Sequence, residues 1–301
     1  MRPLLRLSFI ACGFALAVTV AQPGAAATIT ECDRLATDPA DRNKITAGAS
    51  YDDLFSDAAV TACAKAVAAA AENPRLAYQY GRLLVLRNKL KEGLPHLIRA
   101  AEAGYLAAQL VLASGYGSGA HFKADPIKSH HWHTKAAEQG SKYALASVGL
   151  LLVEGKGVFK DVKKGVALLE KAAAGDNAFA DYSLGVLFLN GVLVKKDVPR
   201  AIKHYERARK AGLGAAFIAL GLMYVTGDGG EKDLKKAQAI FVEGAEAGHN
   251  DVRMLLAQYY QGKFFKVANP DAEARRWLCK AGPQGAQLHL QMYGGEKLVC
   301  K

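Results

Sequence analysis

Large and small apolar residues recur along the chain in a fixed order. In one copy, Ala144 is followed by Val148 and Gly149 at offsets of four and five residues, with a large apolar residue one turn further on. These offsets place the positions on one face of a helix, and their apolar character indicates that this face is buried. The same order begins again at Ala180 and at Ala216.

The second half of each unit begins with an aspartate. An aspartate carboxylate can cap a helix by accepting hydrogen bonds from the backbone N–H groups of its first turn. The residues in this place are Asp125, Asp161, Asp197 and Asp233. Near the end of each unit, two small residues follow one another. The residue directly before them recurs every 36 positions, at Arg99, Lys135, Lys171, Arg207 and Glu243. We therefore predict a unit of two antiparallel helices, repeated along the chain.

Glycines occupy two recurring places in this unit. Inside a helix, glycine costs up to about 1 kcal/mol unless a close neighbour compensates, so we predict that one helix backbone rests against the next at these positions. They are Gly149, Gly185 and Gly221. Other glycines lie where the first helix must end, because glycine tolerates the left-handed conformation found there. These are Gly155, Gly157, Gly191, Gly227 and Gly229.

Together these features resemble the Sel1-like repeats, a branch of the tetratricopeptide-type helical solenoids. The resemblance rests on the motif A-x-x-x-L-G-x-x-Y-x-x-G-x-G-V, the aspartate start and the K-A-A-x-x-G end, four times between Tyr105 and Gly248. A looser unit lies on each side. Some cysteine-rich members of that family bind or weakly hydrolyse penicillin-like compounds, but this sequence lacks their cysteine pair in each repeat.

One hairpin alone cannot cover its own apolar face, so neighbouring hairpins must stack into a solenoid with a curved inner surface. We expect an all-α fold, a right-handed α–α superhelix of about six helical hairpins with irregular terminal caps. The solenoid is expected over residues 74–282, after an N-terminal segment and capping helix at 28–73 and before a C-terminal cap and tail at 283–301. Residues 28–51 are expected to be irregular.

Residues 1–27 have the pattern of a signal peptide: Arg2 and Arg6, then an apolar run too short to span a bilayer, then small residues, with cleavage expected after Ala27. A retained membrane anchor and a lipoprotein processed at Cys12 are the alternatives. Cleavage would leave 37 basic and 28 acidic residues, a formal charge of +9. We expect a periplasmic or secreted protein, with peripheral contact to acidic envelope surfaces and no nucleic-acid partner.

Four cysteines remain after such processing, and an even number in an oxidising compartment indicates disulfides. They are Cys32, Cys63, Cys279 and Cys300. Sequence leaves their connectivity open. We favour pairing Cys32 with Cys63 and Cys279 with Cys300, because each pair would tie a terminal segment to the nearest helix.

The usual catalytic motifs do not occur: there is no S-x-x-K, G-x-S-x-G, P-loop or H-E-x-x-H sequence. We predict no enzymatic activity, no cofactor and no metal. A weak metal candidate is the pair His130 and His133, one helical turn apart, with His121 ahead of it. The stronger interpretation makes His133 an aromatic packing residue beside the core residue Trp132.

The inner face of the stack is then the remaining functional surface. Aromatic residues at or near the starts of first helices are Tyr105, Tyr143, Tyr182 and Phe217, although each also fits an ordinary core position. The hypothesis is a non-enzymatic scaffold or adaptor of the bacterial cell envelope that binds another protein through its concave face and regulates signalling or an envelope process. The alternatives are an envelope hydrolase acting on peptidoglycan or a β-lactam, and a cell-wall binding module.

Overall fold

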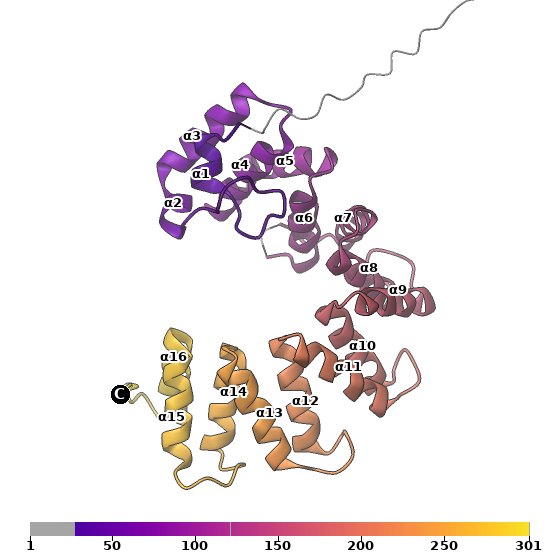
Figure 1. The fold of residues 1–301 in the computed structure, drawn as a ribbon, viewed down its shortest axis with the longest axis vertical. Helices are drawn as coiled ribbons and strands as arrows, with labels where there is room; N and C mark the ends of the chain where they lie inside the picture. Colours follow the sequence, from indigo (N-terminus) through magenta and orange to yellow (C-terminus); the bar gives the residue numbers. More distant parts are fainter. Residues whose placement is uncertain (1–27, 121, 301) are drawn as a thin grey trace, which may run out of the picture.

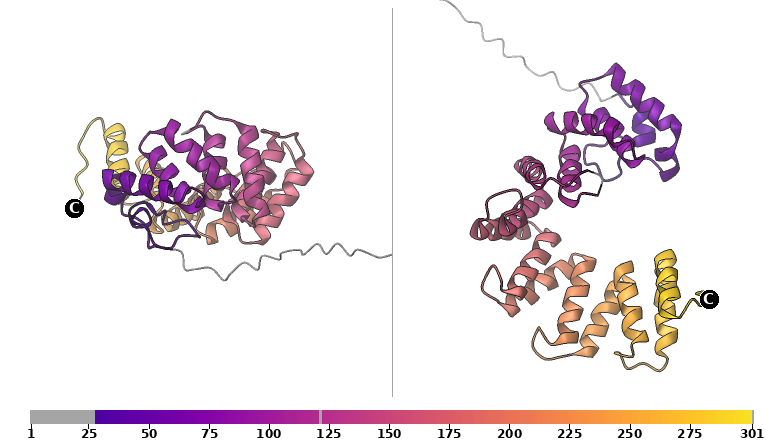
Figure 2. Two further views of the ribbon diagram at one scale, coloured as in Figure 1. Left: turned by 90° about the horizontal axis from the view of Figure 1, so that it is seen from above. Right: turned by 180° about the vertical axis from the view of Figure 1, so that it is seen from behind.

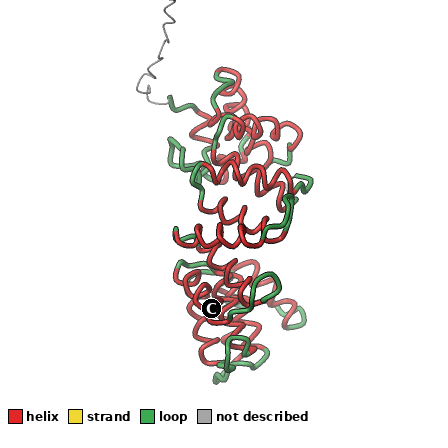
Figure 3. Tube along the Cα trace, turned by 90° about the vertical axis from the view of Figure 1, so that its right-hand side faces the viewer, coloured by secondary structure: helices red, strands yellow, loops and turns green. Residues whose placement is uncertain are grey.

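The computed structural model describes residues 28–120 and 122–300 (Figure 1). The predicted cleavage site at Ala27 and the residue His121 lie outside the described residues. All regular structure in the described part is helical, with no strand, which confirms the expected helical solenoid (Figure 3). The helices are α1 (Glu31–Ala36), α2 (Tyr51–Phe55), α3 (Asp57–Ala69), α4 (Pro74–Leu86), α5 (Leu90–Glu102), α6 (Leu106–Ser118), α7 (Pro126–Glu138), α8 (Lys142–Glu154), α9 (Val162–Ala174), α10 (Ala178–Asn190), α11 (Val198–Lys210), α12 (Gly214–Thr226), α13 (Leu234–Glu246), α14 (Asn250–Gln261), α15 (Pro270–Lys280) and α16 (Gly282–Met292).

Helices α4 to α15 form six antiparallel hairpins, each made of an even-numbered helix and the odd-numbered helix after it. The hairpins follow one another around a C-shaped curve (Figures 1 and 2), and the even-numbered helices α6 and α8 lie on its inner side (Figure 1). Each hairpin contacts the one before it and the one after it, as a solenoid requires. The curve therefore presents an inner surface built mainly from first helices.

The four repeated aspartates lie at the N-caps of α7, α9, α11 and α13. In each, the carboxylate Oδ1 accepts a hydrogen bond from the backbone N–H three residues on, at 2.9–3.1 Å. Each aspartate therefore satisfies a backbone donor that would otherwise lack an intrahelical partner.

The first helices of the central repeats end at glycines in the left-handed conformation: φ is 72° at Gly155, 67° at Gly191 and 88° at Gly227. Gly157 has a φ of 71°, and a Cβ there would lie 2.1 Å from the carbonyl oxygen of Pro126 in the preceding hairpin. The expectation for Gly229 was wrong: the positive φ values in that loop belong to Gly227 and to Gly230, whose φ is 125°.

Where the helices of a hairpin meet, the predicted backbone contact occurs at one of the three predicted glycines. A Cβ on Gly149 would lie 2.8 Å from the carbonyl oxygen of Gly165 in α9, so two backbones touch there. At Gly185 and Gly221 the prediction was wrong. The rings of Tyr205 and Phe241 fill the space instead, 2.6 and 2.3 Å from where a Cβ would be. In the earlier copy this place in the repeat holds Leu169, which leaves the backbones free to approach.

Residues 28–51 are not irregular throughout, because they contain α1. Its first turn is a capping box: the Thr30 hydroxyl accepts from the backbone N–H of Asp33, and the Asp33 carboxylate accepts from the backbone N–H of Thr30. A disulfide from Cys32 to Cys63 joins α1 to α3. The helix is short, and this covalent link to α3 explains how it is held.

At the other end, a disulfide joins Cys279 in α15 to Cys300 in the tail. Both disulfides follow the pairing favoured from the sequence. Helix α16 packs on α15 and α14 and closes the last hairpin. Within the described residues, no helix is both long and apolar enough to cross a membrane.

Candidate functional site

Residues 37–49 lie against the inner side of α4 and α6 and cover it. The hydroxyl of Tyr78 donates a hydrogen bond to Asp38 at 2.6 Å, and the hydroxyl of Tyr105 donates one to Asp41 at 2.5 Å. Burial, with the hydrogen bond to a carboxylate as the second cause, raises the pKa of both tyrosines well above the usual value. The first part of the inner surface is therefore occupied by the chain itself.

The base of this segment is fixed by a buried polar cluster. Asp33 is fully buried, forms an ion pair with Arg75 and accepts a hydrogen bond from the Gln79 amide at 3.1 Å. The same amide donates to the Thr37 hydroxyl at 3.0 Å. Because buried polar groups that lack partners are costly, this set of contacts strongly favours one position of the segment on α4.

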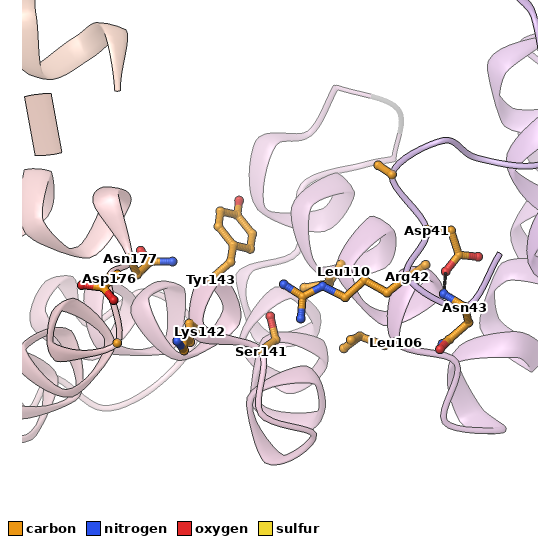
Figure 4. A pocket seen from close by; sticks show the side chains of 13 residues that line it. Asp41, Arg42, Asn43, Leu106, Leu110, Ser141, Lys142, Tyr143, Asp176 and Asn177 are labelled. Atoms are coloured by element: carbon orange, nitrogen blue, oxygen red, sulfur yellow. Dashed lines mark hydrogen bonds between the residues drawn. The ribbon is translucent and has the colours of Figure 1, made fainter. Parts of the chain in front are cut away.

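Beyond the segment, the inner side contains a cavity of about 520 Å³. Its walls are the turn at residues 40–43, the first turns of α6 and α8, and the residues just before α10 (Figure 4). In Figure 4 the Arg42 guanidinium extends from the turn toward Ser141 at the start of α8. Arg42 and Lys142 are exposed, and neither takes part in an ion pair with any described residue. The cavity thus has two free cations and an apolar floor formed by Leu106 and Leu110.

A second cavity, of about 320 Å³, lies beside the first between α6, α7, α8 and α10. It is lined by His133, Tyr143 and Phe179 together with serine hydroxyls and leucines. The ring of Tyr143 is 6.0 Å from that of His133 and 5.8 Å from that of Phe179, centroid to centroid. Tyr143 lines both cavities and is 43% exposed, so one accessible aromatic ring separates the two hollows.

The other aromatic candidates are core residues or are covered. Tyr105 is 7% exposed and lies under Asp41, and Phe217 is 3% exposed and packs against Gly244. Tyr182 is half-buried and its ring contacts Tyr205. Of the four residues suggested by the sequence, only Tyr143 presents its ring to both cavities.

The surroundings of His130 and His133 do not favour metal binding. His133 is buried, and burial lowers its pKa to about 4. Burial also lowers the pKa of His130, and the nearby His131 lowers it further. Among the described residues, no group of three or more His, Cys, Asp or Glu side chains is arranged to hold a metal ion. The prediction of a packing role agrees with the contact between His133 and Tyr143.

Sequence reasoning missed Arg42, Lys142 and Phe179. Arg42 belongs to a segment expected to be irregular, and only the folded chain places it beside α8. A signal existed for Phe179, because it lies 36 residues after Tyr143 and so occupies the same place in the next repeat. Side chains at the same place in successive repeats lie next to each other in a solenoid.

Comparison with known proteins identifies the repeat. The Sel1 repeat family matches six stretches, which are residues 70–105, 106–141, 142–177, 178–213, 216–249 and 253–285. This chain belongs to the Sel1 repeat family. Sel1 repeat proteins generally act as scaffolds for interaction between proteins and are typically not enzymes. Its six Sel1 repeats correspond to the six hairpins from α4 to α15.

Solved structures include similar Sel1 repeat proteins. A Sel1 repeat protein from Oxalobacter formigenes is 27% identical, with a TM-score of 0.54 over 70% of this chain and 86% of that one. A putative Sel1 repeat protein from Klebsiella pneumoniae is 26% identical, with a TM-score of 0.43 over 64% and 95%. The protective antigen c5321 of uropathogenic Escherichia coli is 20% identical, with a TM-score of 0.42 over 77% and 58%. No curated protein sequence matches this one.

Proposed function

We propose that the mature chain is a non-enzymatic scaffold of the bacterial cell envelope that binds another protein through the inner face of its solenoid. The observation that carries this proposal is Tyr143, an exposed aromatic ring between two cavities on that face. Partly exposed aromatic residues beside pockets are the usual anchors of protein interfaces. The general role of Sel1 repeats supports the same function.

The cavities suit an extended segment of a partner protein. Apolar side chains of the segment would enter the hollow lined by Leu106 and Leu110 or the one lined by Phe179. Arg42 and Lys142 would pair with acidic groups of the partner, since neither has an ion-pair partner within the described chain. Residues 37–49 would bound the site at its N-terminal end, because they already cover α4 and α6.

The periplasm is the location we propose, with secretion as the alternative. The signal-peptide pattern of residues 1–27 and the two disulfides support export, because disulfides persist in oxidising compartments. The location is tested by fractionating cells that express the full-length chain. Recovery in the cytoplasmic fraction with residues 1–27 still attached would contradict export.

The test of binding is site-specific photo-cross-linking in envelope extract. A photoreactive phenylalanine derivative replaces Tyr143 in one variant and Phe264, which is 53% exposed in the loop before α15, in the control. We expect a discrete cross-linked protein from position 143 and not from position 264. Competition with unlabelled Tyr143→Ala protein should be weaker than competition with the wild type.

Equal cross-linking from both positions, or undiminished competition by Tyr143→Ala, would show that the inner face is not the binding surface.

Incubation of the purified protein with peptidoglycan and with a β-lactam tests the enzymatic alternative. Turnover of either substrate would overturn the assignment as a scaffold. Circular dichroism of each variant checks that the helices are retained.

A further inference from the structure

The most exposed large apolar side chains in the middle of the described chain gather at one edge of the solenoid. Phe159 is 96% exposed, Val192 is 83% exposed and Ile127 is 70% exposed. Phe159 and Val192 belong to the loops that join α8 to α9 and α10 to α11, on the outer side of consecutive hairpins (Figure 1). The first loop passes close to the residue before Ile127, because a Cβ on Gly157 would lie 2.1 Å from the carbonyl oxygen of Pro126. We call residues 155–164 and 191–196, with Ile127, the loop edge.

The loop edge also carries a concentration of unpaired positive charge. Five of its lysines are exposed, and none of them forms an ion pair with any described residue: Lys160, Lys163, Lys164, Lys195 and Lys196. The acidic residues Asp161 and Glu154 do not neutralise them. Asp161 caps α9, and Glu154 pairs with Lys156 at 2.8 Å.

Two of these lysines lie at a helix N-terminus, where a positive charge is unfavourable. Lys163 and Lys164 lie in the first turn of α9, which contains no acidic residue. The N-terminus of a helix has partial positive charge, so cations there reduce helix stability. Lys164 also lies close enough to His130 to lower its pKa. The charges of Lys163 and Lys164 therefore do not stabilise α9, which favours a role in binding.

We propose that the loop edge docks on a membrane surface that contains anionic phospholipid. Phe159 and Val192 enter the interfacial region of the bilayer, while the lysines reach the lipid phosphates with their flexible side chains. Apolar anchors surrounded by cations are the combination that peripheral membrane proteins use, because neither alone gives stable attachment.

The shape of the edge favours a lipid surface over an acidic protein. A ring that is 96% exposed at the tip of a loop protrudes, so a protein partner would need a matching pocket to bury it. A fluid lipid interface accommodates such a ring without a preformed pocket. Docking by the outer loops would also leave the inner face around Tyr143 open for the proposed protein partner.

The decisive experiment uses the mature protein with both disulfides intact. Its four cysteines are all paired, so Phe159→Cys introduces a single thiol for an environment-sensitive fluorophore. Labelled protein is mixed with vesicles of phosphatidylcholine alone or with added phosphatidylglycerol. We expect a blue shift and an intensity increase only with phosphatidylglycerol, reversed by salt because exposed charges are screened.

Two variants that lose the same number of positive charges distinguish the effect of the loop edge from the effect of the net charge of the protein. The edge variant carries four lysine-to-glutamine substitutions: Lys160→Gln, Lys163→Gln, Lys195→Gln and Lys196→Gln. The control carries the same change at exposed lysines near the opposite ends of the hairpins: Lys135→Gln, Lys171→Gln, Lys210→Gln and Lys280→Gln. Each lysine close to an anionic surface strengthens binding about five-fold. Co-sedimentation with the anionic vesicles should therefore weaken on the order of a hundred-fold or more in the edge variant.

The control should bind within a few-fold of the wild type, and all variants should keep the helical circular dichroism signal. Three results would overturn the proposal. These are absence of binding to anionic vesicles, equal losses in the edge and control variants, and binding without a spectral change at position 159. An acidic protein ligand at this edge would give the first of these results.

Discussion

Replacing Gly221 by alanine tests how the two helices of a hairpin pack. The new Cβ would lie 2.3 Å from Cε1 of Phe241, whereas carbon atoms pack at about 3.5–4.0 Å. The ring must therefore move by more than about 1 Å. The ring has little room to move, because it is fully buried and packs against two other rings. Its centroid lies 5.5 Å from that of Tyr259 and 6.2 Å from that of Phe265.

The expected cost is the difference between two effects. Overpacking a core costs about 1–3 kcal/mol, and the confined ring places this site at the upper end. Alanine regains about 1 kcal/mol of helix propensity relative to glycine. The free energy of unfolding should therefore fall by about 2 kcal/mol. Urea unfolding followed by circular dichroism measures this free energy. The dependence of the free energy on urea concentration must be the same in the variant and the wild type, because solenoids can unfold repeat by repeat and a changed slope would indicate partial unfolding.

A double-mutant cycle then assigns the cause to the ring. Phe241→Leu makes space, so Gly221→Ala with Phe241→Leu should be less destabilised than the sum of the single variants by at least about 1 kcal/mol. The comparison site is Gly149, where a Cβ would meet the backbone carbonyl oxygen of Gly165 at 2.8 Å as well as Cγ of Leu169 at 3.0 Å. Shortening Leu169 should give a smaller rescue there, because the backbone carbonyl remains in place. Neutral or stabilising behaviour of Gly221→Ala alone would refute the packing argument.

Three further predictions concern caps, disulfides and pH. Asp161→Ala should lower the free energy of unfolding by about 1 kcal/mol, measured by urea unfolding, because it removes the cap of α9. Replacing Cys32 and Cys63 together by serine should cost about 3 kcal/mol and lower the melting temperature measured by circular dichroism. Burial lowers the pKa of His133 to about 4, below the usual value for histidine of about 6.5. As the pH falls, this histidine therefore becomes protonated in the unfolded chain before it does in the folded chain. Stability should therefore decrease between about pH 6.5 and 4, and His133→Phe should remove that part of the urea-unfolding pH profile.

Much of the solenoid was readable from the sequence because its determinants are local. The aspartate at each second-helix start and the glycine at each first-helix end act within one turn, so Asp161 and Gly155 have the same meaning in any context. The contact at Gly221 was harder to predict from the sequence. It depends on the size of the residue opposite, and the sequence alone did not show that the Phe241 ring would stand there.

The N-terminal segment was misjudged because its structure depends on distant partners. Thr30 and Asp33 carry a recognisable capping box, but a helix as short as α1 is marginal by itself. What holds it is the disulfide to Cys63 and the buried contacts of Asp33 with Arg75 and Gln79. These partners lie 30 or more residues away in the chain, so no local pattern predicts that residues 37–49 cover α4 and α6.

The location of the candidate site follows from a break in the repeat. Residues 36 apart occupy the same place in successive units, and at one such place the chain has Ala107, Tyr143, Phe179 and Ala215. The aromatic rings therefore occur only in two neighbouring units, and a small residue flanks them on each side. Ala107 leaves open the space that becomes the larger cavity beside Tyr143. The regular positions of the repeat thus build the curve, and the place where aromatic residues interrupt it is where a partner segment would fit.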